Sequence, residues 1–406
     1  MSAVTRPDAR RLAESFDPAR LDAAFYENPY PIYSALREHS PVHRCPDGTW
    51  FLTRYRDLDQ IYRDRTHFSS DKQAAFAPKF GADSPLFEHH TTSLVFRDAP
   101  YHTRVRRQIV GALTPHVLMA MEPGVGALVD HLHDELEQRG QFDLIEHFAA
   151  AIPIEVIGNL LQVPRAERAP LRGWSLAILG ALEPVVSVDQ RIAGDRAVSD
   201  FCAYLRGLIE ARRRHPLGDD DLLTRLAGDT QLTEVELLHN CIFLLNAGHE
   251  TTTNLIGNAL QLLLGAPEAL ERLRADPRCI DGTIEECLRL ESPNQLGNRL
   301  VLEPVRLGAT ELVPGDYLTL CIGAANRDPQ EFIDPDRFDA LRKPNRHLAF
   351  AAGAHACAGM SVARLEARIA ILKTVQRFPD LHLTGGAVRG GRARFRGFKS
   401  LPAACR

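Results

Sequence analysis

The sequence lacks paired cysteines. Its eight cysteines are scattered from Cys45 to Cys405, and no two have the C-x-x-C spacing. Small disulfide-linked domains have a far higher cysteine density, and iron–sulfur clusters and many structural zinc sites take ligands from closely spaced cysteines. These absences exclude a disulfide-linked scaffold and an iron–sulfur protein.

Long apolar segments, repeats and low-complexity runs are also missing. The first 25 residues contain several arginines and aspartates and no apolar stretch long enough for a signal peptide or a membrane span. No linker divides the 406 residues, of which 45% are hydrophobic. We therefore expect a cytoplasmic protein that does not enter a membrane, with residues 1–406 forming a single domain.

The charge balance and the glycine pattern exclude two further classes. With 48 basic and 52 acidic side chains, the net charge is −4, and nucleic-acid binding needs a concentrated basic surface. No G-x-G-x-x-G segment follows a predicted strand, so the sequence predicts no nicotinamide or flavin site. Any electrons that the protein uses must come from a separate partner.

Apolar residues recur with the helical period over most of the chain. Examples are residues 32–36, 117–136, 154–161 and 198–209. Short β-rich pieces bounded by turn residues lie at 50–53, 300–305, 317–322 and 381–383. The pattern predicts a mainly α protein with small β-sheets.

The most regular segment predicts one long helix that is interrupted by polar residues. Thr233 and Glu236 form a capping-box pattern, and Gly265 ends the segment. Its middle, residues 244–253, reads L-L-N-A-G-H-E-T-T-T. Gly248 weakens a helix but allows a flat ligand to approach, and threonine hydroxyls can bond backbone carbonyls. The segment predicts either a groove over a cofactor or a threonine-rich turn that satisfies only its own backbone.

One cysteine lies in a glycine-punctuated loop before a helical pattern. Residues 350–359 read F-A-A-G-A-H-A-C-A-G. Gly353 supplies a turn that a Cβ would obstruct, and the start of the following helix directs N–H groups at Cys357. These features favour a thiolate that ligates a metal. The alternatives are a buried structural cysteine or a zinc site shared with His355.

Two of these segments resemble the cytochrome P-450 superfamily. The cysteine loop matches the haem-ligand pattern of that superfamily at five positions: Phe350, Gly353, His355, Cys357 and Gly359. It departs from the pattern at Ala351, where the family usually has a second glycine. Residues 247–251, A-G-H-E-T, resemble the family's oxygen-activation motif.

The resemblance covers nearly the whole chain and implies a triangular, mostly helical single domain, with a long central helix and one haem b. It implies that Cys357 is the axial ligand of the iron and that Glu250 and Thr251 manage protons during dioxygen activation. It implies four partners for the haem propionates: His102, Arg106, Arg299 and His355. Finally, it implies a structural triad of Glu286, Arg289 and Arg337.

The implied activity is a monooxygenase reaction that inserts one oxygen atom from dioxygen into a small or medium apolar substrate. The family expectation for the electron donor is a ferredoxin, or a flavodoxin, with its reductase. We expect the substrate to contact the loop around residues 74–96 and five further residues: Phe243, Asn246, Ala247, Asn294 and Leu296.

Two other functions are compatible with such a haem protein. A peroxide-driven enzyme of the same fold would not need Glu250 and Thr251, and their presence argues against it. A non-enzymatic sensor or carrier would consume reducing equivalents without forming an oxidised product, so product analysis separates it from a monooxygenase.

Overall fold

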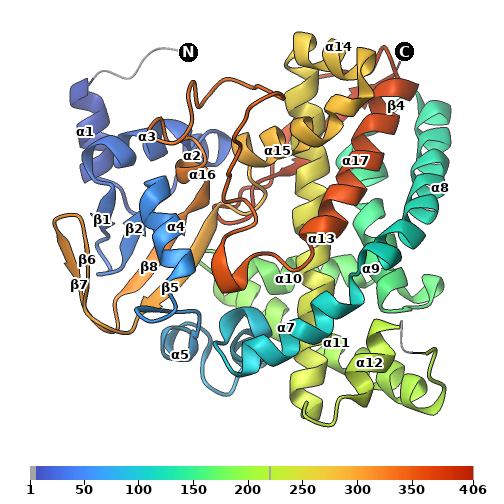
Figure 1. The fold of residues 1–406 in the computed structure, drawn as a ribbon, viewed down its shortest axis with the longest axis horizontal. Coiled ribbons are helices and arrows are strands. Elements are labelled where there is room, and N and C mark those ends of the chain that lie inside the picture. Colours follow the sequence, from blue (N-terminus) through green and yellow to red (C-terminus); the bar gives the residue numbers. More distant parts are fainter. Residues whose placement is uncertain (1–5, 219–220, 406) are drawn as a thin grey trace. The chain divides into compact units, whose positions relative to one another are not determined.

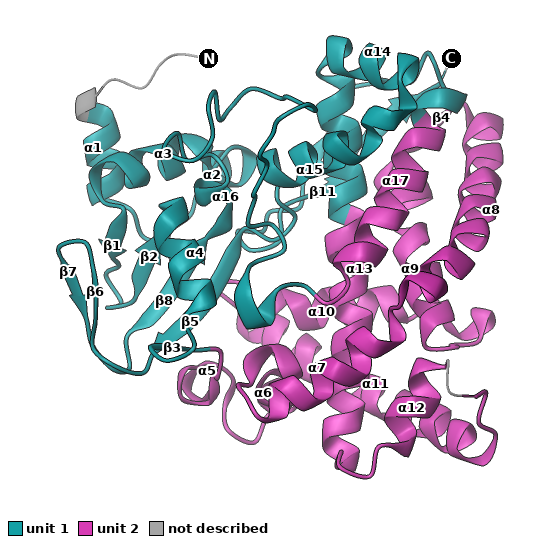
Figure 2. Cartoon of the chain, viewed as in Figure 1, with its two compact units in different colours: residues 1–69, 254–357, 375–406 teal, residues 70–253, 358–374 magenta. Residues whose placement is uncertain are grey.

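The computed structural model describes residues 6–218 and 221–405, and its elements fall into two compact units (Figures 1 and 2). Unit 1 comprises Met1–Ser69, Asn254–Cys357 and Val375–Arg406. Unit 2 comprises Ser70–Thr253 and Ala358–Thr374. The helices α13 (Glu234–Leu264) and α17 (Met360–Arg377) contribute residues to both units. The mainly α class with small sheets is confirmed.

Unit 1 contains a five-stranded sheet with the strand order β1-β2-β8-β5-β3. Its strands are β1 (Val42–Arg44), β2 (Trp50–Leu52), β3 (Phe68–Ser69), β5 (Leu296–Val301) and β8 (Tyr317–Cys321). Only β2 and β8 run parallel. Apolar residues of this sheet pack with Leu58 and Ile61 of α4 (Tyr55–Arg63) into one core cluster. This packing fixes α4 relative to β5.

The remaining elements of unit 1 are shorter. Its other helices are α1 (Arg6–Glu14), α2 (Ala23–Glu27), α3 (Tyr30–His39), α14 (Pro267–Ala275), α15 (Ile280–Leu290) and α16 (Ile322–Ala325). Small antiparallel pairs are formed by β6 (Val305–Leu307) with β7 (Thr310–Leu312), β9 (His382–Leu383) with β12 (Pro402–Ala404), and β10 (Val388–Arg389) with β11 (Phe398–Ser400).

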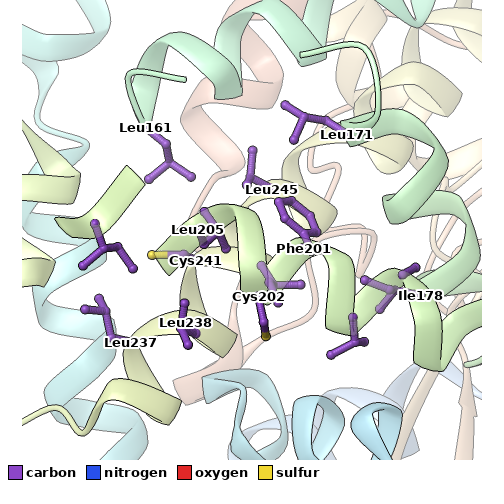
Figure 3. Packing of buried hydrophobic residues seen from close by; sticks show 14 of the residues in the cluster. Leu161, Leu171, Ile178, Phe201, Cys202, Leu205, Leu237, Leu238, Cys241 and Leu245 are labelled. Atoms are coloured by element: carbon purple, nitrogen blue, oxygen red, sulfur yellow. The ribbon is translucent and has the colours of Figure 1, made fainter. Parts of the chain in front are cut away.

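Unit 2 is largely helical. Besides the first part of α13, it contains α5 (Gln73–Phe80), α6 (Pro85–Thr92), α7 (Tyr101–Ala112), α8 (Pro115–Arg139), α9 (Ala151–Leu160), α10 (Leu171–Gly180), α11 (Val188–Arg214) and α12 (Leu222–Gly228). Its core gathers Leu238, Cys241 and Leu245 of α13 with Phe201 and Leu205 of α11 (Figure 3).

The predicted long helix is confirmed together with its first-turn cap. The N–H of Thr233 donates to Glu236 Oε2 at 2.9 Å, and the N–H of Glu236 donates to Thr233 Oγ1 at 3.2 Å. The segment 74–96, which was expected to be a loop, instead contains α5, α6 and a 3-10 turn at Leu94–Phe96. Buried Phe76 and Phe80 give α5 an apolar side that packs into the unit 2 core, and this tertiary packing explains the difference.

Among the residues that the structure describes, no single helix has both the length and the apolar character of a membrane span. The pair α7 and α8, which meet at an angle of 54°, passes this test together on length and composition alone.

Candidate active site

The cysteine loop of unit 1 is closed by backbone hydrogen bonds. The N–H of Cys357 donates to the carbonyl of Phe350 at 2.9 Å, and the N–H of Ala356 donates to the carbonyl of Gly353 at 3.1 Å. Between them lies a short 3-10 turn, Gly353–His355. Cys357 is half-buried, and α17 begins three residues later at Met360. The thiol is thus carried on a backbone that its own loop holds in place.

Two residues of this loop have positive φ. Gly353 has φ +68°, and a Cβ there would clash with the carbonyl oxygen of Tyr62, so both the conformation and the close approach require glycine. Ala351 has φ +54°, a region that alanine adopts at a cost of about 1 kcal/mol relative to glycine. The departure from the expected glycine therefore falls on a backbone position that favours glycine.

Tyr62 of α4 connects three parts of unit 1, and sequence reasoning missed it. Its carbonyl lies against Gly353, and its hydroxyl occupies the space where a Cβ of Gly297 would lie. The guanidinium carbon of Arg299 lies 5.1 Å from the centroid of the Tyr62 ring. Burial raises the pKa of Tyr62 to about 12, so its hydroxyl stays neutral at physiological pH. The only sequence signal for this arrangement was the presence of glycines at 297 and 353.

Arg299 and His355 are the two predicted propionate partners in unit 1. Arg299 lies on β5, is only 9% exposed, and donates from Nη1 to the carbonyl of Asn298 at 2.8 Å. His355 is half-buried in the 3-10 turn of the cysteine loop. Tyr62 thus contacts both the strand that carries Arg299 and the turn that carries His355.

In unit 2, the predicted propionate pair lies on α7. His102 is buried in the first turn of the helix, and Arg106, one turn later, is half-buried. The (i, i+4) spacing places both side chains on one face of α7. The structure therefore groups the four candidates in pairs, with one pair in each unit.

The polar middle of α13 has one accessible side, bordered by buried residues. Ala247 is exposed and Phe243 and Thr251 are half-buried, at a spacing of four residues, whereas Asn246 and Glu250 are buried. The Thr251 hydroxyl donates to the carbonyl of Ala247 at 2.8 Å, as predicted for threonines in this segment. Phe243, Ala247 and Thr251 thus form an accessible strip along the middle of the helix.

Gly248 has a different role from the one predicted. A Cβ there would lie 3.3 Å from Cδ1 of Ile157 on α9, which is tighter than ordinary packing. Within unit 2, the absence of a side chain at 248 allows α9 to pack closely against α13. The flat-ligand explanation applies better to Ala247, which is accessible.

The pair of Glu286 and Arg289, expected as part of a structural triad, is fully buried in unit 1. Arg289 donates to Glu286 through Nε at 2.8 Å and through Nη2 at 2.7 Å, and both side chains are 0% exposed. The triad was expected to include Arg337, but the second guanidinium at Glu286 belongs to Arg342, at 3.2 Å. Arg337 is exposed and contributes only its carbonyl, which accepts from Arg289. Corrected, the triad is Glu286, Arg289 and Arg342.

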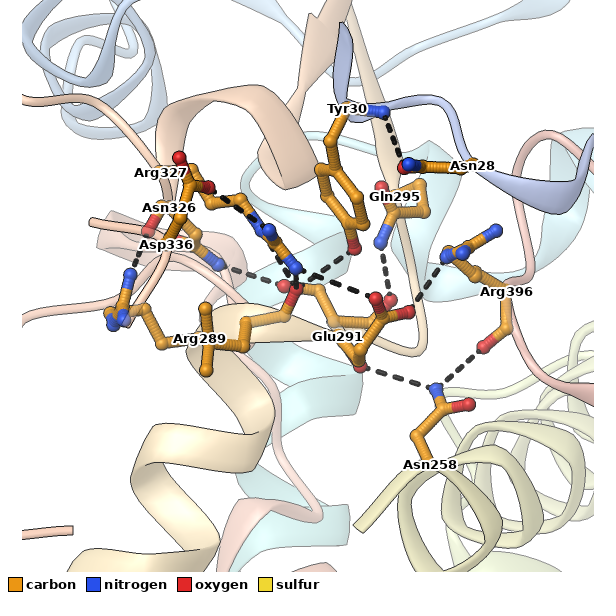
Figure 4. Close-up of polar contacts among 12 residues, drawn as sticks. Asn28, Tyr30, Asn258, Arg289, Glu291, Gln295, Asn326, Arg327, Asp336 and Arg396 are labelled. Atoms are coloured by element: carbon orange, nitrogen blue, oxygen red, sulfur yellow. Dashed lines mark hydrogen bonds and ion pairs between the residues drawn. The ribbon is translucent and has the colours of Figure 1, made fainter. Parts of the chain in front are cut away.

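A second buried ion cluster surrounds Glu291 (Figure 4). Arg396 donates to Glu291 Oε2 at 2.7 Å, and Arg327 approaches Oε1 at 3.4 Å. Arg327 also lies over the ring of Tyr30, with its guanidinium carbon 3.4 Å from the centroid. No sequence motif indicated this cluster, because its members come from segments that are far apart in the chain.

The predicted substrate contacts differ in their surroundings. Phe243 and Ala247 lie on the accessible side of α13, and Asn246 is buried beside them. In unit 1, Asn294 is half-buried and forms a β-bridge with Phe395. Leu296, expected to line the pocket, is 2% exposed and packs in the core with Tyr33 and Phe51. It is a core residue, because its position on β5 directs the side chain into the sheet packing.

Among the described residues, no group of three or more His, Cys, Asp or Glu has a metal-holding arrangement, so the zinc alternative finds no ligand set there. Within unit 1, a single half-buried thiol in a hydrogen-bonded loop, with half-buried His355 in the same loop and buried Arg299 on β5, instead fits a haem with two propionates.

Comparison with known proteins decides the family. The biotin biosynthesis cytochrome P450 of Bacillus subtilis (strain 168) is 35% identical over 363 residues, which cover 88% of this chain and 91% of that protein. This chain belongs to the cytochrome P450 family. The family model described as Cytochrome P450 matches residues 195–385. The cytochrome P450 monooxygenase PikC of Streptomyces venezuelae is 36% identical, covering 95% of this chain and 93% of that protein.

The fold comparison agrees. The crystal structure of P450BioI in complex with a hexadec-9Z-enoic acid ligated acyl carrier protein matches with a TM-score of 0.90 at 34% identity, covering 95% of this chain and all of that chain. The cytochrome P450 fold, the haem b cofactor and the haem-thiolate monooxygenase activity expected from the sequence are therefore confirmed. Bacterial cytochrome P450s act on organic substrates with electrons from redox partners.

Proposed function

We propose that residues 1–406 act as one catalytic domain in which Cys357 is the axial ligand of the haem iron. The closed loop around the Cys357 thiol is the observation that carries this assignment. His102, Arg106, Arg299 and His355 bind the two propionates through charge-assisted hydrogen bonds. When bound, the haem with its thiolate ligand supplies the dioxygen-activating chemistry, and the protein tunes it.

Thr251 and Glu250 handle the protons of the reaction in this proposal. Because the Thr251 hydroxyl donates its proton to the Ala247 carbonyl, its oxygen keeps lone pairs with which to accept a hydrogen bond from a water or a bound group. Glu250, the next residue, is a 6% exposed carboxylic acid that can hold or release a proton at the margin of the accessible strip. Thr251 positions a proton, and Glu250 supplies it.

Replacing Thr251 by alanine tests this role. Loss of a positioned proton-transfer group typically lowers the rate on the order of 100-fold, so we expect product formation to fall by about that factor while reductant is still consumed. Product and NADH consumption are measured together. Thr253→Ala is the matched control, because the Thr253 hydroxyl makes the same type of bond, to the His249 carbonyl at 3.1 Å. Equal coupling of reductant to product in both variants would remove Thr251 from the proton path.

The electron donor in this proposal is a ferredoxin with its reductase, with a flavodoxin as the alternative, and the protein works in the cytoplasm. Arg107 and Arg346 are exposed, and Arg364 is half-buried; these cations suit an acidic partner. Turnover is measured with purified ferredoxin and with purified flavodoxin over a range of salt concentrations. If these arginines dock the donor, the turnover rate falls as the salt concentration rises. At a given salt concentration, it is lower still in Arg107→Glu. A rate that is independent of salt would contradict electrostatic docking.

The proposed substrate is a small or medium apolar organic molecule. One solved relative is bound to an acyl carrier protein that bears a fatty acid, and another relative is a vitamin D(3) 25-hydroxylase. Both names describe largely hydrocarbon substrates. For this chain, the apolar side chain of Phe243 beside Ala247 on the accessible face of α13 supports the same class.

A further inference from the structure

Two asparagines on α13 have opposite hydrogen-bond states. Asn240 is saturated: its Oδ1 accepts from the N–H of Leu94 at 3.0 Å, and its Nδ2 donates to the Tyr101 hydroxyl and to the Glu236 carbonyl, both at 2.7 Å. Asn246 is 2% exposed, and its Nδ2 has no hydrogen-bond partner. Leaving a buried donor unsatisfied costs about 1–3 kcal/mol. Packing therefore explains Asn240 but not Asn246.

The amide of Asn246 is oriented by a serine on another helix. The hydroxyl of Ser175, on α10, donates to Asn246 Oδ1 at 2.7 Å, and Ser175 is itself 2% exposed. Because Oδ1 is engaged, the unsatisfied atom is Nδ2, which can only donate. Neighbouring side chains such as Leu245 and Ile178 belong to the apolar core and offer no acceptor. The serine thus fixes which end of the amide is left for another molecule.

The position of Asn246 connects this donor with the reaction. It lies one turn before Glu250 and one turn after Phe243, so it borders the accessible strip formed by Phe243, Ala247 and Thr251. A substrate that contacts this strip would pass the Asn246 amide.

We propose that Asn246 Nδ2 donates a hydrogen bond to an oxygen acceptor of the substrate, and that Ser175 is the positioning residue that sets this polarity. The inference rests on the proposed function and narrows its substrate class to apolar molecules that carry a hydrogen-bond-accepting oxygen, as a ketone, ester or lactone does. A site built to hydrogen-bond a substrate group discriminates against an analogue that lacks it, because the buried polar group is then left unpaired. The hydrogen bond from Asn246 would also fix which carbon, at a set distance from the acceptor oxygen, is oxidised.

Matched ligand pairs test the proposal. Cyclododecanone and cyclododecane share a carbon skeleton, as do cyclooctanone and cyclooctane, and only the ketones carry an acceptor. Dissociation constants are measured on the holoenzyme from the change in the Soret band. The two compounds differ in their free energies of transfer from water to an apolar solvent, and this difference is subtracted from the difference in binding free energy. After this correction, we expect the ketone to bind roughly tenfold more tightly than the alkane for at least one ring size. No such preference at either size would overturn the proposal.

Variants then assign the preference to the amide. Asn246→Leu should abolish the ketone preference, and Ser175→Ala should reduce it because the amide is no longer held. Ser175→Thr keeps the hydroxyl and should restore it, an outcome that a purely structural role for the serine does not predict. Ser199→Ala is the control, because the Ser199 hydroxyl bonds only its own helix, at the Asp195 carbonyl. An unchanged preference in Asn246→Leu would contradict the proposal.

The carbon monoxide spectrum of each variant separates this inference from the assignment of the haem ligand. A thiolate-type spectrum with no ketone preference overturns the role of Asn246 alone. If the unmodified protein gives no thiolate-type spectrum, the proposed function is overturned, and the inference with it.

Discussion

The two buried ion clusters of unit 1 differ in their hydrogen bonding from the buried polar side chains in the middle of α13. In unit 1, the carboxylates at the centres of two buried ion clusters are paired: Glu286 meets Arg289 and Arg342, and Glu291 meets Arg396 and Arg327. In the middle of α13 in unit 2, the buried polar side chains include Asn246, His249 and Glu250, and Asn246 and His249 retain nitrogen atoms without hydrogen-bond partners. The difference indicates that the two ion clusters of unit 1 specify the fold, whereas the unpaired groups in the middle of α13 are available for ligands, water or protons.

The largest expected effect comes from breaking a saturated pair. Glu286→Gln leaves the Arg289 guanidinium buried without its countercharge, and such changes cost about 3–5 kcal/mol. Glu271→Gln is the control, because Glu271 and Arg274 have the same (i, i+3) spacing at 2.7 Å, but Glu271 is 70% exposed. We expect this control to lose less than about 1 kcal/mol. Urea unfolding of both variants measures the contrast, and similar losses would show that burial of the pair does not matter.

Acidification should act on the uncharged groups of unit 2. Burial, and secondarily Arg172, lower the pKa of His249 from 6.5 to about 4. His249 therefore binds a proton more readily in the unfolded chain than in the folded one. The contribution of neutral His249 to the free energy of unfolding is complete above pH 6.5 and is lost as the pH falls from 6.5 towards 4. At about 1.36 kcal/mol per pKa unit, the loss reaches about 3 kcal/mol. Burial also lowers the pKa values of His89 and His239, which act in the same direction.

His249→Leu should therefore reduce the slope of unfolding free energy against pH between 4 and 6.5, leaving the part that His89 and His239 contribute. The exposed His116 of α8 offers the control, His116→Leu, which should keep the steep dependence of the unmodified protein. If the two variants showed the same pH profile, His249 would not be the group responsible.

The smallest predicted effect sharpens the account of the cysteine loop. Because Ala351 has φ +54°, Ala351→Gly should stabilise the protein by up to about 1 kcal/mol, although glycine also gains freedom in the unfolded chain. Ala352→Gly is the control, because Ala352 has φ −145° and its methyl group is buried, so it should lose stability. Thermal unfolding of the holoenzyme distinguishes the two signs. A loss of stability in both variants would contradict strain at position 351.

Local sequence signals predicted much of what the structure contains. The capping box at Thr233 and Glu236, the long helix after it, and the (i, i+3) pairing of Glu286 with Arg289 depend on residues close together in the chain. The cysteine loop was recognisable for the same reason: its glycine spacing reflects a local backbone requirement, which at Gly353 is a positive φ.

Features that depend on tertiary contacts were missed or assigned to the wrong residue. Arg342 was not distinguishable from Arg337 without the path of the irregular segment that brings it to Glu286. Tyr62, Ser175 and the packing of Ile157 against Gly248 have partners more than 70 residues away in the sequence. Leu296 was predicted to line the pocket, but the sheet on which it lies buries its side chain in the core.

The carbon monoxide difference spectrum of Cys357→Ser shows whether Cys357 ligates the haem iron. Cys279→Ser, at another partly buried cysteine, serves as the control. We expect Cys279→Ser to keep the thiolate-type spectrum and Cys357→Ser to lose it. A thiolate-type spectrum retained by Cys357→Ser would contradict the account.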